Sequence, residues 1–237
     1  MGGSLTVFEL VGLPGSGKST LAQGLLERLA SQGKTWGERE AIGRLGSSRA
    51  GHLARLAAFT LARGRCLPAT IRFGAAVHPA TTARLRFAAK LAAWPYRLSV
   101  ARALGYDTVV LDQGILQSAW CVLLEGSLQR ADLLDKVIED LFAGCDATFA
   151  FISVDLDIER AAARIKARGP MAAPFDRSEA ETLRLLRQHA EHLERVVEAG
   201  VRVTGAPHLR VDGSRPLAES AEQIDAFVDS VTGSPVC

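Results

Sequence analysis

The stretch "VGLPGSGKST", residues 11–20, decides the fold that we expect for this chain. It follows an apolar run with β-branched residues, "LTVFELV" at 5–11, and it precedes "STLAQGLLERLASQG" at 19–33, where apolar residues recur at helical spacing. A strand, a glycine-rich turn and a helix in this order are typical of a loop that binds nucleotide phosphates. The alternative is a glycine-rich turn that binds nothing.

Residues 12–19, called the phosphate loop below, match the pattern G-x-x-x-x-G-K-S in full. The glycines leave room for backbone N–H groups to converge on phosphate oxygens, and the following helix points its positive dipole end at the same anion. Lys18 is predicted to reach the β- and γ-phosphates, and the Ser19 hydroxyl to ligate Mg²⁺. The predicted nucleotide-binding residues are Gly12, Leu13, Pro14, Gly15, Ser16, Gly17, Lys18, Ser19 and Thr20.

The whole chain fits one α/β domain, residues 1–237, because 237 residues with 48% hydrophobic composition can bury a substantial core. It contains no apolar run long enough for a transmembrane helix and does not begin like a signal peptide, so we expect a cytoplasmic protein. Its four cysteines are scattered, which argues against a zinc site or a disulfide framework. His189 and His192 fall on a polar helix and are expected at the surface rather than as metal ligands.

Charge is distributed unevenly along the chain. Residues 41–106 contain eleven Lys and Arg and no Asp or Glu, so this segment carries +11 although the net charge of the chain is only +2. Such a segment favours an anionic partner, which leaves a small molecule, a membrane surface or nucleic acid open. Its apolar residues recur at helical spacing, so the alternative is a set of arginines on solvated helices. We expect an acceptor-side helical insertion at 41–106 that faces a small anionic or polar molecule, and we do not expect nucleic acid to bind.

Strand and helix signals alternate along the rest of the chain. Further strands are expected at 35–40, 106–112, 147–155 and near 208–212, and further helices within 114–143 and at 156–169, 178–200 and 217–231. Pro68, Pro79 and Pro95 are expected to divide residues 41–106 into separate or kinked helices. Alternation of this kind predicts a parallel sheet covered by helices on both faces, with the ligand at the carboxyl ends of the strands.

Asp112 follows the apolar run Val109, Val110 and Leu111 at one of these strand ends. A carboxylate there, beside a phosphate loop, can hold Mg²⁺ or accept a hydroxyl proton. Glu40, after the second expected strand, is a second candidate for the base, although a structural role is favoured for it.

Arginines recur in "ERAAARIKARGPMAAPFDR", residues 159–177. Arg160, Arg164 and Arg168 fall four residues apart on one helical face, and Arg177 follows a short segment with glycine and proline. Residues 160–177 are therefore predicted to form a lid that closes over a nucleotide, excludes water and brings Arg164, Arg168 or Arg177 to the transferring phosphoryl group. A solvated arginine stripe is the alternative.

The chain resembles the thymidylate kinase-like branch of the P-loop nucleoside and nucleotide kinases. The resemblance covers nearly the whole chain through "GLPGSGKST", "ERE", "VVLDQG", "RIKARG" and "RVDGSRPLAESAEQI", of which only the first is specific. It implies a three-layer P-loop fold with a five-stranded parallel sheet, ATP with Mg²⁺ as cofactors, and an acceptor pocket between the second and third strands. It also implies that residues 212–216 lie near the adenine and Asp112 near the reacting groups. The family usually has Asp-Arg where this chain has Asp112-Gln113, so we expect an acceptor other than thymidylate.

We therefore predict an ATP- and Mg²⁺-dependent kinase with Lys18, Asp112 and the lid arginines as catalytic residues and with Ser19 and Asp112 as metal ligands. Two other functions stay open, a kinase of a non-nucleotide hydroxylated metabolite and a nucleotide-gated regulatory ATPase or switch. The identity of the acceptor, the choice between ATP and GTP, and a homodimer also stay open.

Overall fold

The computed structural model describes residues 5–33, 35–37, 66–77, 81–124, 131–168 and 178–233. Its strands are β1 (Thr6–Val11), β2 (Thr35–Gly37), β3 (Thr108–Leu111), β4 (Thr148–Asp155) and β5 (His208–Asp212). The helices are α1 (Lys18–Gln32), α4 (Cys66–Val77), α5 (Thr81–Ala103), α6 (Ile115–Leu124), α7 (Ala131–Ala143), α8 (Ile158–Ala167), α9 (Glu179–Thr204) and α10 (Leu217–Thr232).

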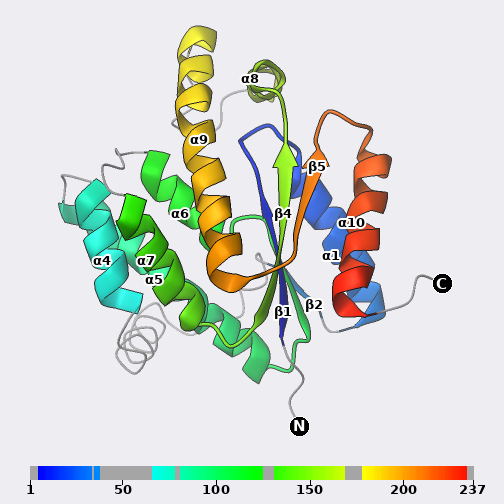
Figure 1. The fold of residues 1–237 in the computed structure, drawn as a ribbon. Helices are drawn as coiled ribbons and strands as arrows, with labels where there is room; N and C mark the ends of the chain where they lie inside the picture. Colours follow the sequence, from blue (N-terminus) through cyan, green and yellow to red (C-terminus); the bar gives the residue numbers. More distant parts are fainter. Residues whose placement is uncertain are drawn as a thin grey trace.

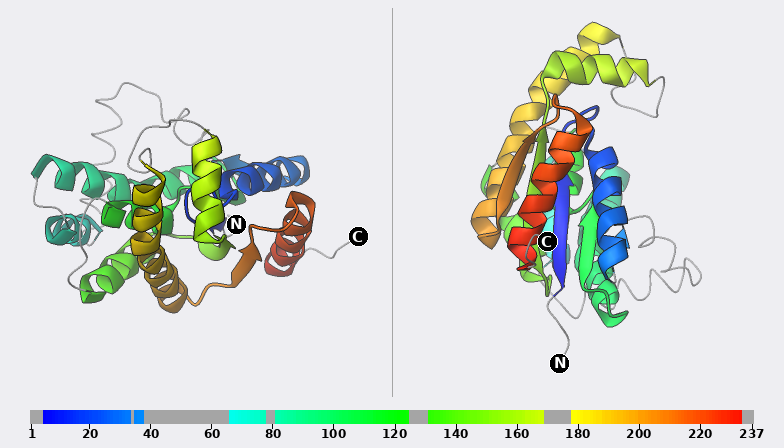
Figure 2. Two further views of the ribbon diagram at one scale, coloured as in Figure 1. Left: turned by 90° about the horizontal axis from the view of Figure 1, so that it is seen from above. Right: turned by 90° about the vertical axis from the view of Figure 1, so that its right-hand side faces the viewer.

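The five strands form one parallel sheet in the order β2-β3-β1-β4-β5, with β1 in the centre (Figure 1). Helices α1 and α10 cover one face, whereas α4, α5, α6, α7 and α9 cover the other (Figures 1 and 2). Each face has its own hydrophobic core of buried side chains. The predicted three-layer α/β fold with helices on both faces is confirmed.

Strand β1 shows why the apolar run at its position is continuous. Val7 and Val11 pack into the core beneath α6 and α9, and Phe8 and Leu10 pack into the core beneath α1 and α10. A parallel strand buried on both faces needs apolar residues at nearly every position. Glu9 is the exception to this apolar pattern. Its side chain lies on the α6 face of the sheet, and none of its surface is exposed.

Some predicted elements differ from the observed ones. Helix α5 runs through Pro95 as one element, so the segment is not divided into separate helices at that residue, and a kink there stays a prediction. His189 is 2% exposed, so the expectation of a surface position for it is wrong, because α9 packs its inner side against α6 and α7. Residues 38–40 of the expected second strand, and residues 41–65 and 78–80 of the positive segment, lie outside the described residues.

No helix in the described part of the chain has the length and the apolar composition needed to span a bilayer.

Candidate functional site

The carboxyl ends of all five strands meet at one edge of the sheet, where α8 crosses above them (Figure 1). Strand β1 leads there into the phosphate loop, β3 into Asp112, β4 into α8, and β5 into the turn at Asp212. Because β1 pairs with both β3 and β4, the phosphate loop emerges between Asp112 and the start of α8. The topology thus brings most of the predicted site segments together.

The backbone of the phosphate loop needs glycine at two positions. Gly15 and Gly17 have φ angles of +86° and +96°, a region that residues with a Cβ rarely adopt. Gly15 also packs against α8, since a Cβ at this position would lie 2.7 Å from the carbonyl oxygen of Ala161. These glycines fix the sharp turn from β1 into α1.

The turn leaves backbone donors available for an anion. The N–H of Ser16 donates to the Leu13 carbonyl at 3.1 Å. By contrast, the N–H groups of Gly15, Gly17 and Ser19 meet no hydrogen-bond acceptor within the part of the chain that the structure describes. Lys18, 9% exposed, begins α1 directly behind them. Converging amides, a helix N-terminus and a lysine together form a site that suits phosphate oxygens.

Asp112 lies one residue beyond β3 and is partly exposed, as the prediction of a strand-end carboxylate requires. Gln113 follows it with an exposed side chain, and its backbone carbonyl accepts a hydrogen bond of 3.3 Å from the Ser118 hydroxyl. Ser118 in turn accepts a bond of 3.1 Å from the indole N–H of Trp94 on α5. The turn that carries Asp112 is therefore anchored to α5, a helix of the positively charged segment at 41–106.

The arginines of α8 separate into different environments. The Nη1 atom of Arg164 donates to the carbonyl oxygens of Gly15 and Ser16, both at 3.3 Å, and its Nη2 atom donates to the Gly213 carbonyl at 3.1 Å. Arg168 follows the last residue of α8 as its C-cap and is exposed. Arg164 thus binds the backbone of the phosphate loop and of the β5–α10 turn. Arg177, predicted as a lid arginine, and Glu40, predicted as a second candidate base, lie outside the described residues.

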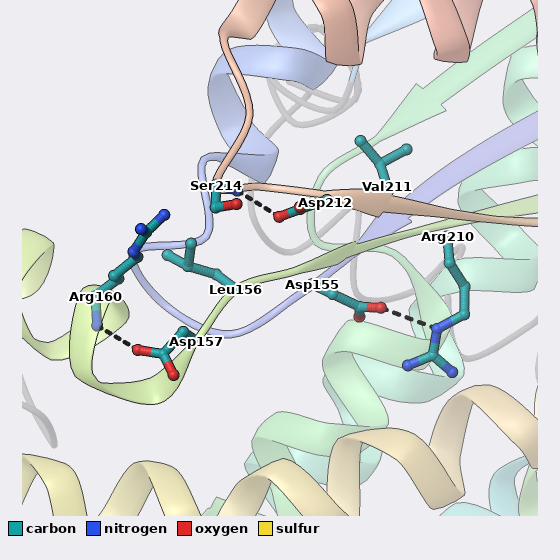
Figure 3. A pocket seen from close by; sticks show the side chains of 8 residues that line it. All are labelled: Asp155, Leu156, Asp157, Arg160, Arg210, Val211, Asp212 and Ser214. Carbon is teal, nitrogen blue, oxygen red and sulfur yellow. Dashed lines mark hydrogen bonds and ion pairs between the residues drawn. The ribbon is translucent and has the colours of Figure 1, made fainter.

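A pocket of about 650 Å³ lies beyond the ends of β4 and β5 (Figure 3). Arg160 approaches it from α8, and the Asp212–Ser214 turn closes the side nearest the phosphate loop. The Ser214 side chain and its N–H, which donates to Asp212 at 2.8 Å, both lower the pKa of the Asp212 carboxyl, and the side-chain hydrogen bond has the larger effect. The lining residues are Asp155, Leu156, Asp157, Arg160, Arg210, Val211, Asp212 and Ser214.

The sequence prediction missed two buried polar residues at the site, Glu9 and Gln117. The Glu9 carboxyl accepts bonds of 3.0 Å from the N–H groups of Ile115 and Gln117, and the Gln117 Oε1 accepts a 3.1 Å bond from the Gly12 N–H. Burial raises the pKa of Glu9 to about 7, although the bonds from the α6 backbone oppose the shift. The available signal was a charged residue inside an otherwise apolar strand.

Comparison with solved structures now adds a fold relationship. Two structures of deoxyadenosine kinase from M. mycoides match this chain at 14% identity over 94% of its length and 99% of theirs. The TM-score is 0.55 for the structure with bound dATP and 0.51 for the one with bound dCTP. This chain shares the fold of deoxyadenosine kinase. No protein-family model and no curated protein sequence matches it.

The residues at the site also suit a magnesium ion held together with phosphates. Mg²⁺ prefers oxygen ligands and is usually bound by one or two protein groups plus phosphate oxygens and water. Ser19 offers an exposed hydroxyl in the first turn of α1, and Asp112 offers a partly exposed carboxylate beyond the neighbouring strand. No cluster of three or more His, Cys, Asp or Glu suited to a metal occurs among the described residues.

Proposed function

We propose that this protein is a kinase that transfers the γ-phosphoryl group of ATP, with Mg²⁺, to a small polar or anionic acceptor. The observation that carries the proposal is the set of unused hydrogen-bond donors in the phosphate loop. The N–H groups of Gly15, Gly17 and Ser19, at or near the start of α1, have no hydrogen-bond acceptor among the described residues. The fold shared with deoxyadenosine kinase supports the same reaction class.

Nucleosides are the first acceptor class to consider, because the structural neighbours are named as kinases of a deoxynucleoside. The finer assignment to the thymidylate kinase-like branch rests on the sequence motifs. Within it, Gln113 makes thymidylate itself a poor candidate, since an amide supplies neither the charge nor the paired donors of a guanidinium. A hydroxylated metabolite that is not a nucleotide remains the second acceptor class.

In the proposed reaction the acceptor oxygen attacks the γ-phosphorus, the bond between the γ-phosphorus and the bridging oxygen breaks, and ADP leaves. Lys18 and the free loop amides balance the charge on the phosphates. Ser19 and Asp112 would hold Mg²⁺, which supplies further charge neutralisation when it is bound. The general base that accepts the proton of an acceptor hydroxyl is either Asp112 or Glu40.

The base of the nucleotide is proposed to occupy the pocket between α8 and the β5–α10 turn (Figure 3). Arg164 links the two walls to the phosphate loop, because its guanidinium binds both the loop carbonyls and the Gly213 carbonyl. Planar guanidinium groups such as that of Arg160 can also stack on an aromatic base.

The test of the proposed function is an acceptor screen with Mg²⁺ and ATP. Nucleosides, nucleoside monophosphates and hydroxylated metabolites are supplied one at a time, ADP formation is measured, and the product mass confirms transfer. We expect one acceptor class to raise ADP formation at least tenfold above the basal rate, with thymidylate not the best substrate. Thymidylate as the most efficient acceptor contradicts the specificity argument, and no stimulation by any acceptor favours the regulatory ATPase.

The α8 arginines give a second prediction. Arg164→Ala is expected to raise the KM for ATP about tenfold and to change kcat less, because Arg164 holds the resting shape of the phosphate loop. Arg168→Ala or Arg177→Ala is expected to lower kcat more than ATP affinity, because a lid arginine acts mainly in the transition state. Steady-state kinetics with the best acceptor from the screen separates these effects.

Arg195→Ala is the matched control, since Arg195 on α9 is exposed and pairs with Glu191 of the same helix at 3.9 Å. It should change neither constant by more than twofold. If Arg168→Ala and Arg177→Ala both leave kcat unchanged, the lid hypothesis is abandoned for these residues. A fall in kcat alone for Arg164→Ala would place that arginine on the phosphoryl group instead.

A further inference from the structure

Three hydrogen bonds join Glu9, Gln117 and Gly12 into one buried chain, called the Glu9–Gln117–Gly12 chain here. The two oxygens of Glu9 accept from the N–H groups of Ile115 and Gln117, and the side-chain oxygen of Gln117 accepts from the N–H of Gly12. Glu9 and Gln117 are 0% and 2% exposed. The Glu9–Gln117–Gly12 chain of hydrogen bonds therefore connects the centre of the sheet, the start of α6 and the start of the phosphate loop.

Packing alone does not explain a glutamate at position 9. The position faces the apolar core beneath α6, where a valine or leucine would bury its surface at lower cost, because burying a carboxyl group carries a desolvation penalty. What the carboxyl supplies instead is a cap for α6, whose first N–H groups have no acceptor within their own helix. Glu9 thus holds the start of α6 against the central strand.

The segments joined by this chain are those with proposed roles in the reaction. Gly12 is the first glycine of the phosphate loop, and α6 begins at Ile115, three residues beyond Asp112. The turn between them also touches the same carboxyl group, because a Cβ on Gly114 would lie 2.4 Å from the Glu9 Cδ atom. The Glu9 carboxyl therefore lies directly against the turn that carries Asp112 and leaves no room there for a side chain at position 114.

We propose that Glu9 and Gln117 are positioning residues that fix the phosphate loop and the Asp112 turn relative to each other for phosphoryl transfer. They act through the Gly12 N–H and the first turn of α6. The proposal rests on the proposed function for the role of Asp112, whereas the effect on the Gly12 N–H is independent of any activity. A purely structural role would instead lower thermal stability and leave the loop and the kinetics of the folded protein unchanged.

Two variants test the proposal. Gln117→Leu keeps an unbranched Cβ and a high helix propensity. It replaces the amide with an apolar group and thereby removes the acceptor of the Gly12 N–H. Glu9→Gln keeps the size of the side chain but places an amide N–H₂ against one of two backbone N–H donors. Asp140→Asn is the matched control, because Asp140 is 8% exposed and lies near the end of α7 that leads into β4, at the opposite edge of the sheet.

The measurements are hydrogen exchange of nucleotide-free protein in peptides covering residues 9–17, the Kd for Mg²⁺-ATP without acceptor, and kcat with the best acceptor, all well below the melting temperature. Gln117→Leu is expected to speed exchange at the phosphate loop and to weaken Mg²⁺-ATP binding about tenfold. Glu9→Gln is expected to lower kcat about tenfold or more, with a smaller change in Kd. Asp140→Asn should change none of the three.

Unchanged exchange, Kd and kcat in folded Gln117→Leu would overturn the proposal, even if Glu9→Gln fails to fold. The proposal would also be overturned if Gln117→Leu and Asp140→Asn, at an equal loss of melting temperature, changed hydrogen exchange, Kd and kcat by the same amounts. Failure of the proposed function has a different signature, because wild-type protein would then transfer phosphate to none of the acceptors, whether or not it binds Mg²⁺-ATP. In that case faster exchange in Gln117→Leu still supports the contact, and unchanged exchange rejects it.

Discussion

Lys18→Ala is expected to lower kcat for phosphoryl transfer by about 10²- to 10³-fold while the protein stays folded. Lys18 is the first residue of α1 and lies directly behind the loop amides, so its ammonium group is the cation that the loop itself supplies to the phosphates. Alanine is a better helix former than lysine, and the loop conformation is set by Gly15 and Gly17 rather than by the lysine side chain. The loss should therefore appear in turnover and not in the melting temperature.

The measurement for Lys18→Ala is ADP formation with the best acceptor, accompanied by a thermal melt. Lys136→Ala serves as the control, because Lys136 on α7 is an exposed lysine paired with Glu139 at 3.0 Å. Its turnover should match the wild type. Turnover of Lys18→Ala within twofold of the wild type would reject the phosphate-loop assignment.

Asp112→Asn is expected to lower kcat by about 10²- to 10⁴-fold, with a smaller effect on ATP affinity. The amide keeps the size of the side chain but removes the charge that would hold Mg²⁺ and the site that would accept a proton. Asp107→Asn is the matched control, since Asp107 is exposed and precedes the same strand, β3, at its opposite end. A normal kcat for Asp112→Asn would make Glu40 the remaining candidate for the base.

The fold was predictable because its signals are local. Strands β1, β3 and β4 are mainly apolar runs, β2 and β5 are short segments placed by the alternation of strands and helices, and the loop motif at residues 12–19 predicts which strand leads to the nucleotide. The position of Asp112 followed from the same rule, since parallel strands present their carboxyl ends at one edge. These predictions needed no knowledge of how the helices pack.

The contacts made by Arg164 and Glu9 could not be predicted in this way. The four-residue spacing of the α8 arginines places them on one face, but the angle of α8 to the sheet decides that Arg164 binds loop carbonyls. The hydrogen-bond partners of Glu9, Ile115 and Gln117, are separated from it by 106 and 108 residues. A charged residue inside an apolar strand indicates a buried hydrogen-bond partner. The sequence alone does not identify that partner when it lies more than 100 residues away.

The order β2-β3-β1-β4-β5 has a consequence for how the chain folds during its synthesis. Thr6 of β1 pairs with Thr108 and Thr148, so β1 leaves the ribosome roughly 100 and 140 residues before its two neighbours, a delay on the order of ten seconds. An unpaired apolar strand is prone to associate with strands of other chains during such a wait. Glu9, with an ordinary pKa of 4.5 before burial, carries a negative charge in the middle of that strand. The residue that later caps α6 therefore places a charge where it would oppose such association until β3 and α6 are made.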